Sequence, residues 1–88
     1  MLYMVIEHYK PGALKAIYER FHARGRMMPK GLVYINSWVV EDGTKCFQVM
    51  ECDDESLLHI WAKNWEDLCE FEFIRVVSSS DMSNSLTV

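Results

Sequence analysis

The hydrophobic positions of the chain switch between two periods. Residues 2–9 (LYMVIEHY) are rich in β-favouring side chains and stop at Lys10-Pro11-Gly12, which predicts a first strand. Apolar residues then recur at helical spacing, at Leu14, Ile17, Tyr18 and Phe21. This stripe predicts an amphipathic helix that begins after Pro11 and ends near Gly25, followed by a loop over residues 26–31.

The middle of the chain predicts a β-hairpin. Residues 32–41 and 44–52 are strand-like, and Asp42-Gly43 between them is a strong signal for a two-residue turn. Such a turn pairs Glu41 with Thr44 and thereby sets which side chains share a face. We expect one face to be core, with Val33, Ile35, Ser37, Val39, Cys46, Gln48, Met50 and Cys52. The other mixes aromatic and polar groups: Tyr34, Asn36, Trp38, Val40, Phe47, Val49 and Glu51.

A second helix and a fourth strand complete the pattern. The acidic run 53–55 precedes an apolar stripe of Leu57, Leu58, Trp61, Trp65 and Leu68, which predicts a helix with its acids at the favourable end. Residues 71–77 predict the last strand. We expect one domain over residues 1–77 and a polar, serine-rich tail over 78–88 that is frayed or loosely docked.

The order β-α-β-β-α-β predicts an α+β, ferredoxin-like fold. Right-handed crossovers place both helices on one face of a four-stranded antiparallel sheet. The uncovered face would carry several of the side chains Tyr3, Val5, Tyr34, Trp38, Phe47, Val49, Ile74 and Val76. A mainly apolar patch of that size is more than monomers usually expose, so we expect a homodimer through this face.

Composition and charge narrow the range of partners. Half of the 88 residues are hydrophobic, a quarter are charged, and the net charge is −4. The longest apolar run, residues 1–6, is too short to span a membrane, so we expect no membrane partner. Arg20, Arg24, Arg26 and Lys30 surround the end of the first helix. They fit a solvated helix end or, alternatively, contact with a phosphate-bearing ligand; the basic excess is too small to favour nucleic acid.

The three cysteines, Cys46, Cys52 and Cys69, fit neither a disulfide scaffold nor a zinc site. Their number is odd and they lack the C-x-x-C spacing. We expect three reduced, mostly buried thiols in a cytoplasmic protein, with no metal and no cofactor.

Six residues are candidates for ligand binding or proton transfer. Asn36, between Tyr34 and Trp38, can donate and accept beside flat aromatic groups, which suits a small planar ligand; dimer packing is the alternative. Glu7, His8 and Glu51 lie on or at the ends of strands. Each is an acid–base candidate if it faces a closed cavity, and a surface group if it faces solvent. Trp61 and Trp65 are expected in the core, with indole N–H groups that need partners.

Two stretches carry a family resemblance. One is Gly31-Leu32-Val33-Tyr34 with Ser37-Trp38 and the Asp42-Gly43 turn; the other is Trp65-Glu66-Asp67-Leu68 with Glu70-Phe71-Glu72 and Val76-Val77. Together with Lys10-Pro11-Gly12, they resemble a small family of bacterial proteins of unknown function, which is similar to dimeric α+β barrel proteins. The resemblance implies two sheets packed face to face.

That superfamily includes cofactor-free oxygenases, isomerases, haem-degrading enzymes and modules of no known chemistry, so the resemblance supplies no reaction. The haem-degrading members use an amide on the first strand with a histidine and a tryptophan on the second helix. Here His59 and Trp61 are present, but the first strand has no Asn or Gln.

Two functions therefore stay open. One is a dimeric barrel module that binds a small, partly aromatic or carbonyl-bearing molecule. The alternative is a cofactor-free oxygenase or isomerase in which Glu7, His8 or Glu51 transfers a proton. An enzyme should show a pocket with one ionisable group pointing inward, whereas in a module side chains should fill that space.

Overall fold

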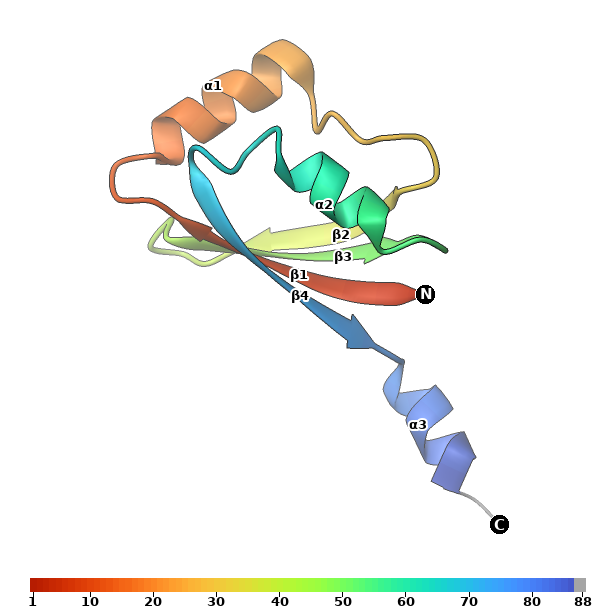
Figure 1. Cartoon of the computed structure of the whole chain (residues 1–88). Coiled ribbons are helices and arrows are strands. Elements are labelled where there is room, and N and C mark those ends of the chain that lie inside the picture. The colour runs from red at the N-terminus through yellow and green to blue at the C-terminus, as the bar shows by residue number, and fades with distance from the viewer. Residues whose placement is uncertain (87–88) are drawn as a thin grey trace.

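The computed structural model describes residues 1–86. Its elements are β1 (Leu2–Tyr9), α1 (Leu14–Arg24), β2 (Val33–Val39), β3 (Lys45–Glu51), α2 (Ser56–Ala62), β4 (Cys69–Val76) and α3 (Ser79–Leu86). The strands form one antiparallel sheet in the order β2-β3-β1-β4. Helices α1 and α2 cover one face of this sheet, here called the helix face, and leave the other, the open face, uncovered (Figure 1). The predicted ferredoxin-like order is confirmed.

Strand β1 is central, and its side chains alternate between the two faces. Tyr3, Val5 and Glu7 point to the helix face and are buried. Tyr3 and Val5, two of the eight candidates for the uncovered face, are therefore not among the residues that it carries. Their place on the open face is taken by Leu2, Met4, Ile6 and His8. Residues 1–6 are apolar at every position, so alternation alone does not reveal the buried side.

The β2–β3 hairpin keeps the predicted register only near its turn. Trp38 lies opposite Phe47, as predicted, although the turn is longer than two residues: Glu41 and Thr44 do not pair, and the Gly43 N–H donates to the Val40 carbonyl oxygen. A bulge at Ile35 then shifts the pairing by one residue, so that Tyr34 lies opposite Met50. Since Met50 is fully buried on the helix face, Tyr34 is on the helix face too, and its predicted place beside Trp38 is wrong.

The same bulge overturns two predicted core positions. Val33 and Ile35 are 55% and 49% exposed rather than buried. Beyond the bulge, Ser37 and Val39 pair with Gln48 and Cys46 on the helix face, as expected.

The core lies between the helix face and the two helices, as the tryptophan pattern predicts. Trp61 and Trp65 are buried, and both indole Nε1–H groups donate to the Arg26 carbonyl oxygen, at 2.9 and 3.2 Å. Helix α2 ends at Ala62, earlier than its apolar stripe implied. The chain then passes Trp65 in turns and enters β4 at Cys69, two residues before the predicted start.

The serine-rich tail contains a helix that its sequence did not predict. Residues 79–86 form α3, which has no buried residue and extends away from the body beyond the end of β4 (Figure 1). The prediction of a frayed tail also covers residues 87 and 88, which lie outside the described part of the chain. No helix among residues 1–86 has the length and apolarity needed to cross a membrane.

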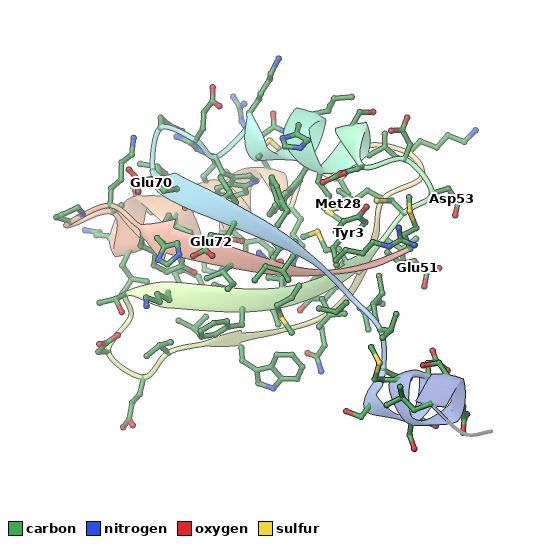
Figure 2. The ribbon with its side chains drawn as sticks, turned by 60° about the horizontal axis from the view of Figure 1, so that its bottom comes forward. Tyr3, Met28, Glu51, Asp53, Glu70 and Glu72 are labelled. Carbon is green, nitrogen blue, oxygen red and sulfur yellow. The ribbon has the colours of Figure 1, made fainter. Side chains whose placement is uncertain are left out.

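The open face is apolar in the middle and charged at its ends. Figure 2 turns this side toward the viewer and shows Glu70 and Glu72 toward one end, with Glu51 at the other. His8 pairs with Glu72 at 2.5 Å. Between these charged groups lie the apolar side chains of four strands: Leu2, Met4, Ile6, Trp38, Phe47, Val49, Ile74 and Val76.

Candidate functional site

A cavity of about 90 Å³ lies between α1 and the helix face of the sheet. One water molecule needs roughly 10–15 Å³ by this kind of measure, so the space has room for several water-sized groups. Aromatic and aliphatic side chains form most of the wall, among them Tyr9, Ile17, Tyr18, Phe21, Val39, Trp61 and Trp65. Polar groups interrupt this wall at five positions: Glu7, Arg26, Ser37, Cys46 and Gln48.

Glu7 is the acidic group of the cavity. It stands in the central strand, only 6% exposed, and the Cys69 thiol lies 3.8 Å from its Oε2 as a weak donor. Burial raises the pKa of Glu7 to about 7, against the smaller opposing effects of the Cys69 thiol and the Arg26 guanidinium. Both protonation states are therefore populated near neutral pH, as a general acid or base requires.

Gln48 is the least satisfied polar side chain of the core. It is 4% exposed, and its Oε1 accepts no hydrogen bond from any described residue. Buried amide oxygens normally have a partner, and leaving one without a bond costs about 1–3 kcal/mol. Gln48 also lines the cavity, so a small movement of its side chain would offer a bound molecule an acceptor that the protein itself leaves unused.

Arg26 is held in an unusual backbone segment. Gly25 before it and Met27 after it both have positive φ, 67° and 58°, and the latter is uncommon for a residue with a side chain. The two indole N–H groups fix the Arg26 carbonyl oxygen. These two hydrogen bonds fix the backbone of the loop at Arg26.

The Arg26 guanidinium is packed between aromatic rings. Its carbon lies 3.6 Å from the ring centroid of Tyr34 and 5.0 Å from that of Phe21. Among residues 1–86 no carboxylate forms an ion pair with it, whereas Arg20 makes a two-pronged pair with Asp67 at 2.7 Å. Arg26 is half-buried and lines the cavity, so the expectation of a merely solvated helix end is wrong for this residue.

The thiols near the cavity are proton donors rather than nucleophiles. All three cysteines are free and buried, as predicted. Burial raises the pKa of Cys46 to about 11 and that of Cys69 to about 12, and Glu7 acts in the same direction. Both thiols therefore stay protonated at neutral pH. In the described part of the chain, no three His, Cys, Asp or Glu side chains are grouped to hold a metal.

Comparison with known proteins identifies the family. The sequence matches the family model "Domain of unknown function (DUF3303)" over residues 1–87. The chain belongs to the DUF3303 family. No curated protein matches it.

Two crystal structures share the fold of this DUF3303 protein. One is an uncharacterised NIPSNAP domain protein from Burkholderia xenovorans, with TM-score 0.55 and 14% identity. The other is protein Atu4242 from Agrobacterium tumefaciens, with TM-score 0.52 and 12% identity. Each alignment covers 90% of this chain and 96% of the other. At such identities the likeness shows the fold alone.

Of the six candidate residues proposed for this DUF3303 protein from sequence, the structure places only Glu7 in the cavity. Asn36, Trp38, Glu51 and His8 belong to the open face. The Asn36 side chain is used locally, because its Oδ1 accepts the backbone N–H of the next residue at 2.8 Å.

The sixth candidate, Tyr34, acts on the cavity through a neighbour, since its ring supports the Arg26 guanidinium. Sequence reasoning missed Gln48 as a site residue, and it considered Arg26 only as one of four basic residues that could contact a phosphate-bearing ligand. Gln48 had a readable signal, because it is an amide in a row of predicted core positions between Cys46 and Met50. The inward turn of Arg26 depends on a loop conformation that no local pattern reveals.

Proposed function

We propose that this DUF3303 protein is a homodimeric module that binds a small, partly aromatic or carbonyl-bearing molecule in the cavity between α1 and the sheet. The observation that carries the proposal is that Gln48, one of the residues lining that cavity, is buried and has a side-chain Oε1 without a hydrogen-bond partner among residues 1–86. Ligand pockets typically combine a mostly apolar wall with a few polar groups that orient the ligand, and this wall has that composition.

A second candidate function uses the same cavity for chemistry. Glu7 is buried there with a pKa raised to about 7, which favours a cofactor-free oxygenase or isomerase in which Glu7 takes a proton from the bound molecule. His8 and Glu51, the other proton-transfer candidates, lie on the open face and so outside this cavity. A Glu7→Gln variant separates the two functions, since binding alone tolerates an amide and proton transfer does not.

The homodimer is supported by the open face. Its central side chains are apolar, and Trp38 is 55% exposed. A second copy packed on the same face would bury these groups, and roughly 1,600 Å² of total buried area is standard for a stable complex. Helix α3 extends on this side of the sheet with Met82 and Leu86 exposed, so it would contact the partner (Figure 1). A cytoplasmic location is favoured by three cysteines that remain free thiols.

The test of the cavity uses the two indole N–H signals of Trp61 and Trp65 in ¹⁵N–¹H NMR spectra. The protein is titrated with phenol, 2-hydroxybenzamide and 2-hydroxybenzoate as probes. We expect at least one probe to shift both signals saturably, and the Gln48→Met variant to bind it more weakly. Asn36→Met is the matched control, because it removes an amide from the open face. Unshifted signals with all three probes at millimolar concentration would contradict the proposal.

Native mass spectrometry of freshly purified protein tests the assembly and reports any retained ligand in the same spectrum. A dimer mass is expected at micromolar concentration. A monomer under these conditions would end the dimer proposal, and would leave the cavity to be judged by the titration.

A further inference from the structure

The polar groups of the cavity differ in kind, and this difference carries information about its ligand. Arg26 provides a permanent cation with paired N–H donors, Gln48 provides an acceptor without a partner, and Glu7 provides a carboxyl group. A molecule that satisfies all three needs an anionic oxygen pair and a separate O–H or N–H group.

Arg26 is prepared for an anion before any ligand arrives. Its backbone is fixed through the two indoles, and its guanidinium is stacked on Tyr34 and Phe21. Contacts with aromatic rings leave the guanidinium N–H groups without an acceptor, because a ring satisfies the charge but takes no strong hydrogen bond. No carboxylate among residues 1–86 pairs with it. A positive φ at Met27 is a strain that the surrounding contacts maintain, as is common at ligand sites.

We propose that Arg26 makes the cavity selective for a small planar carboxylate that also carries a hydroxyl group. The inference rests on the proposed function and names the ligand class of the same site. The carboxylate binds the edge of the guanidinium through two parallel hydrogen bonds, the geometry for which arginine is suited. The hydroxyl group donates to Oε1 of Gln48. The planar body lies among the aromatic side chains of the wall.

A phosphate ester fits this cavity less well. A dianion would meet a single guanidinium and, at pH 8, the negative charge of Glu7 in the same small space. A carboxylate carries one charge, and a protonated Glu7 can donate to it. We therefore expect carboxylate binding to weaken as pH rises from 6 to 8.

The other titratable groups around Glu7 do not reproduce this pH dependence. Cys46 and Cys69 on the flanking strands have pKa values raised to about 11 and 12, and burial also raises the pKa of Tyr9. Tyr18 and Arg26 also line the cavity, from α1 and from the loop that follows it.

Isothermal titration calorimetry with matched probes tests the inference. The 2-, 3- and 4-isomers of hydroxybenzoate are each compared with the corresponding hydroxybenzamide and with benzoate. One hydroxybenzoate should bind about tenfold or more tightly than its amide at pH 6, as expected for a charge-assisted bond, and more tightly than benzoate. The preference over the amide should shrink at pH 8.

Variants test whether Arg26 is the residue that causes the preference for the carboxylate over the amide. Arg26→Gln should abolish the preference for the carboxylate, and Arg26→Lys, which keeps the charge without the fork, should retain part of it. Arg24→Gln is the matched control, because this exposed arginine lies at the end of α1. The Trp61 and Trp65 indole signals report whether each variant keeps its fold.

The possible results distinguish the ligand class from the proposed function. Equal or tighter binding of the amide, or a preference that survives in folded Arg26→Gln, would overturn the inference and leave the proposed function standing. Absence of binding by every probe would overturn both. Loss of the preference in Arg26→Gln, with its retention in Arg24→Gln, would support the inference.

Discussion

Replacing Glu7 with glutamine should stabilise the protein at alkaline pH. The side chain is 6% exposed, and burial raises its pKa from the ordinary value of 4.5 to about 7. The folded state therefore binds the proton more tightly than the unfolded chain. Between these two values the folded state holds more protons, so the free energy of unfolding falls as pH rises, and it levels off above pH 7.

The size of this effect follows from the same two pKa values. Each unit corresponds to about 1.4 kcal/mol, so the wild type should lose up to about 3 kcal/mol of stability between pH 4.5 and 8 from this one group. Glu7→Gln lacks the ionisation. It should match the wild type near pH 5 and exceed it at pH 8 by an amount of that order, reduced by whatever partners the new amide N–H groups fail to find.

Urea denaturation at fixed protein concentration, from pH 5 to 8, measures the difference between variant and wild type. Titrations elsewhere in the chain cancel in this difference. Glu51→Gln is the matched control, because it makes the same change at an exposed glutamate of the same sheet. A flat difference for Glu7→Gln, or one that favours the wild type as pH rises, would refute the buried-carboxyl account.

Three further changes test other parts of the structure. Trp65→Ala should cost about 3–5 kcal/mol in urea denaturation, because the ring is buried and bonded to the Arg26 carbonyl oxygen; a loss below 1 kcal/mol would contradict this packing. Trp38→Asp should leave the monomer folded and convert dimer to monomer in sedimentation, unless Trp38 lies outside the interface. Deleting residues 79–88 should weaken the dimer without changing the unfolding of the monomer, and an unchanged dimer dissociation constant would exclude α3 from the contact.

The fold could be predicted because the local periodicity of hydrophobic residues and the residue types in the turns determine the order of strands and helices. The hairpin register near Asp42-Gly43 was predicted from the position of the turn, and the burial of Trp61 from helical spacing; Trp65 is also buried, although it lies beyond the end of α2. The sheet face on which each side chain lies was harder to predict. The bulge at Ile35 inserts one residue without any glycine or proline to mark it, and every prediction on its N-terminal side changed face as a result.

The site could be predicted only in part, because it joins residues from five separate segments. The sequence identified Glu7 as an acidic residue inside a strand, but it did not show which face of the sheet the side chain occupies. Gln48 was placed correctly on the core face, and its lack of a partner is a property of the packed structure. Arg26 required knowledge that the loop after α1 folds back to the tryptophans, which no nearby sequence pattern shows.

The cavity itself is tested most directly by crystal structures of the protein grown with each hydroxybenzoate isomer at millimolar concentration. Electron density for the ligand is expected between α1 and the sheet, with the carboxylate at the guanidinium of Arg26 and the hydroxyl group within hydrogen-bond distance of Gln48 Oε1. Density for the ligand on the open face near Trp38, or a cavity that holds only water with every isomer, would contradict this expectation.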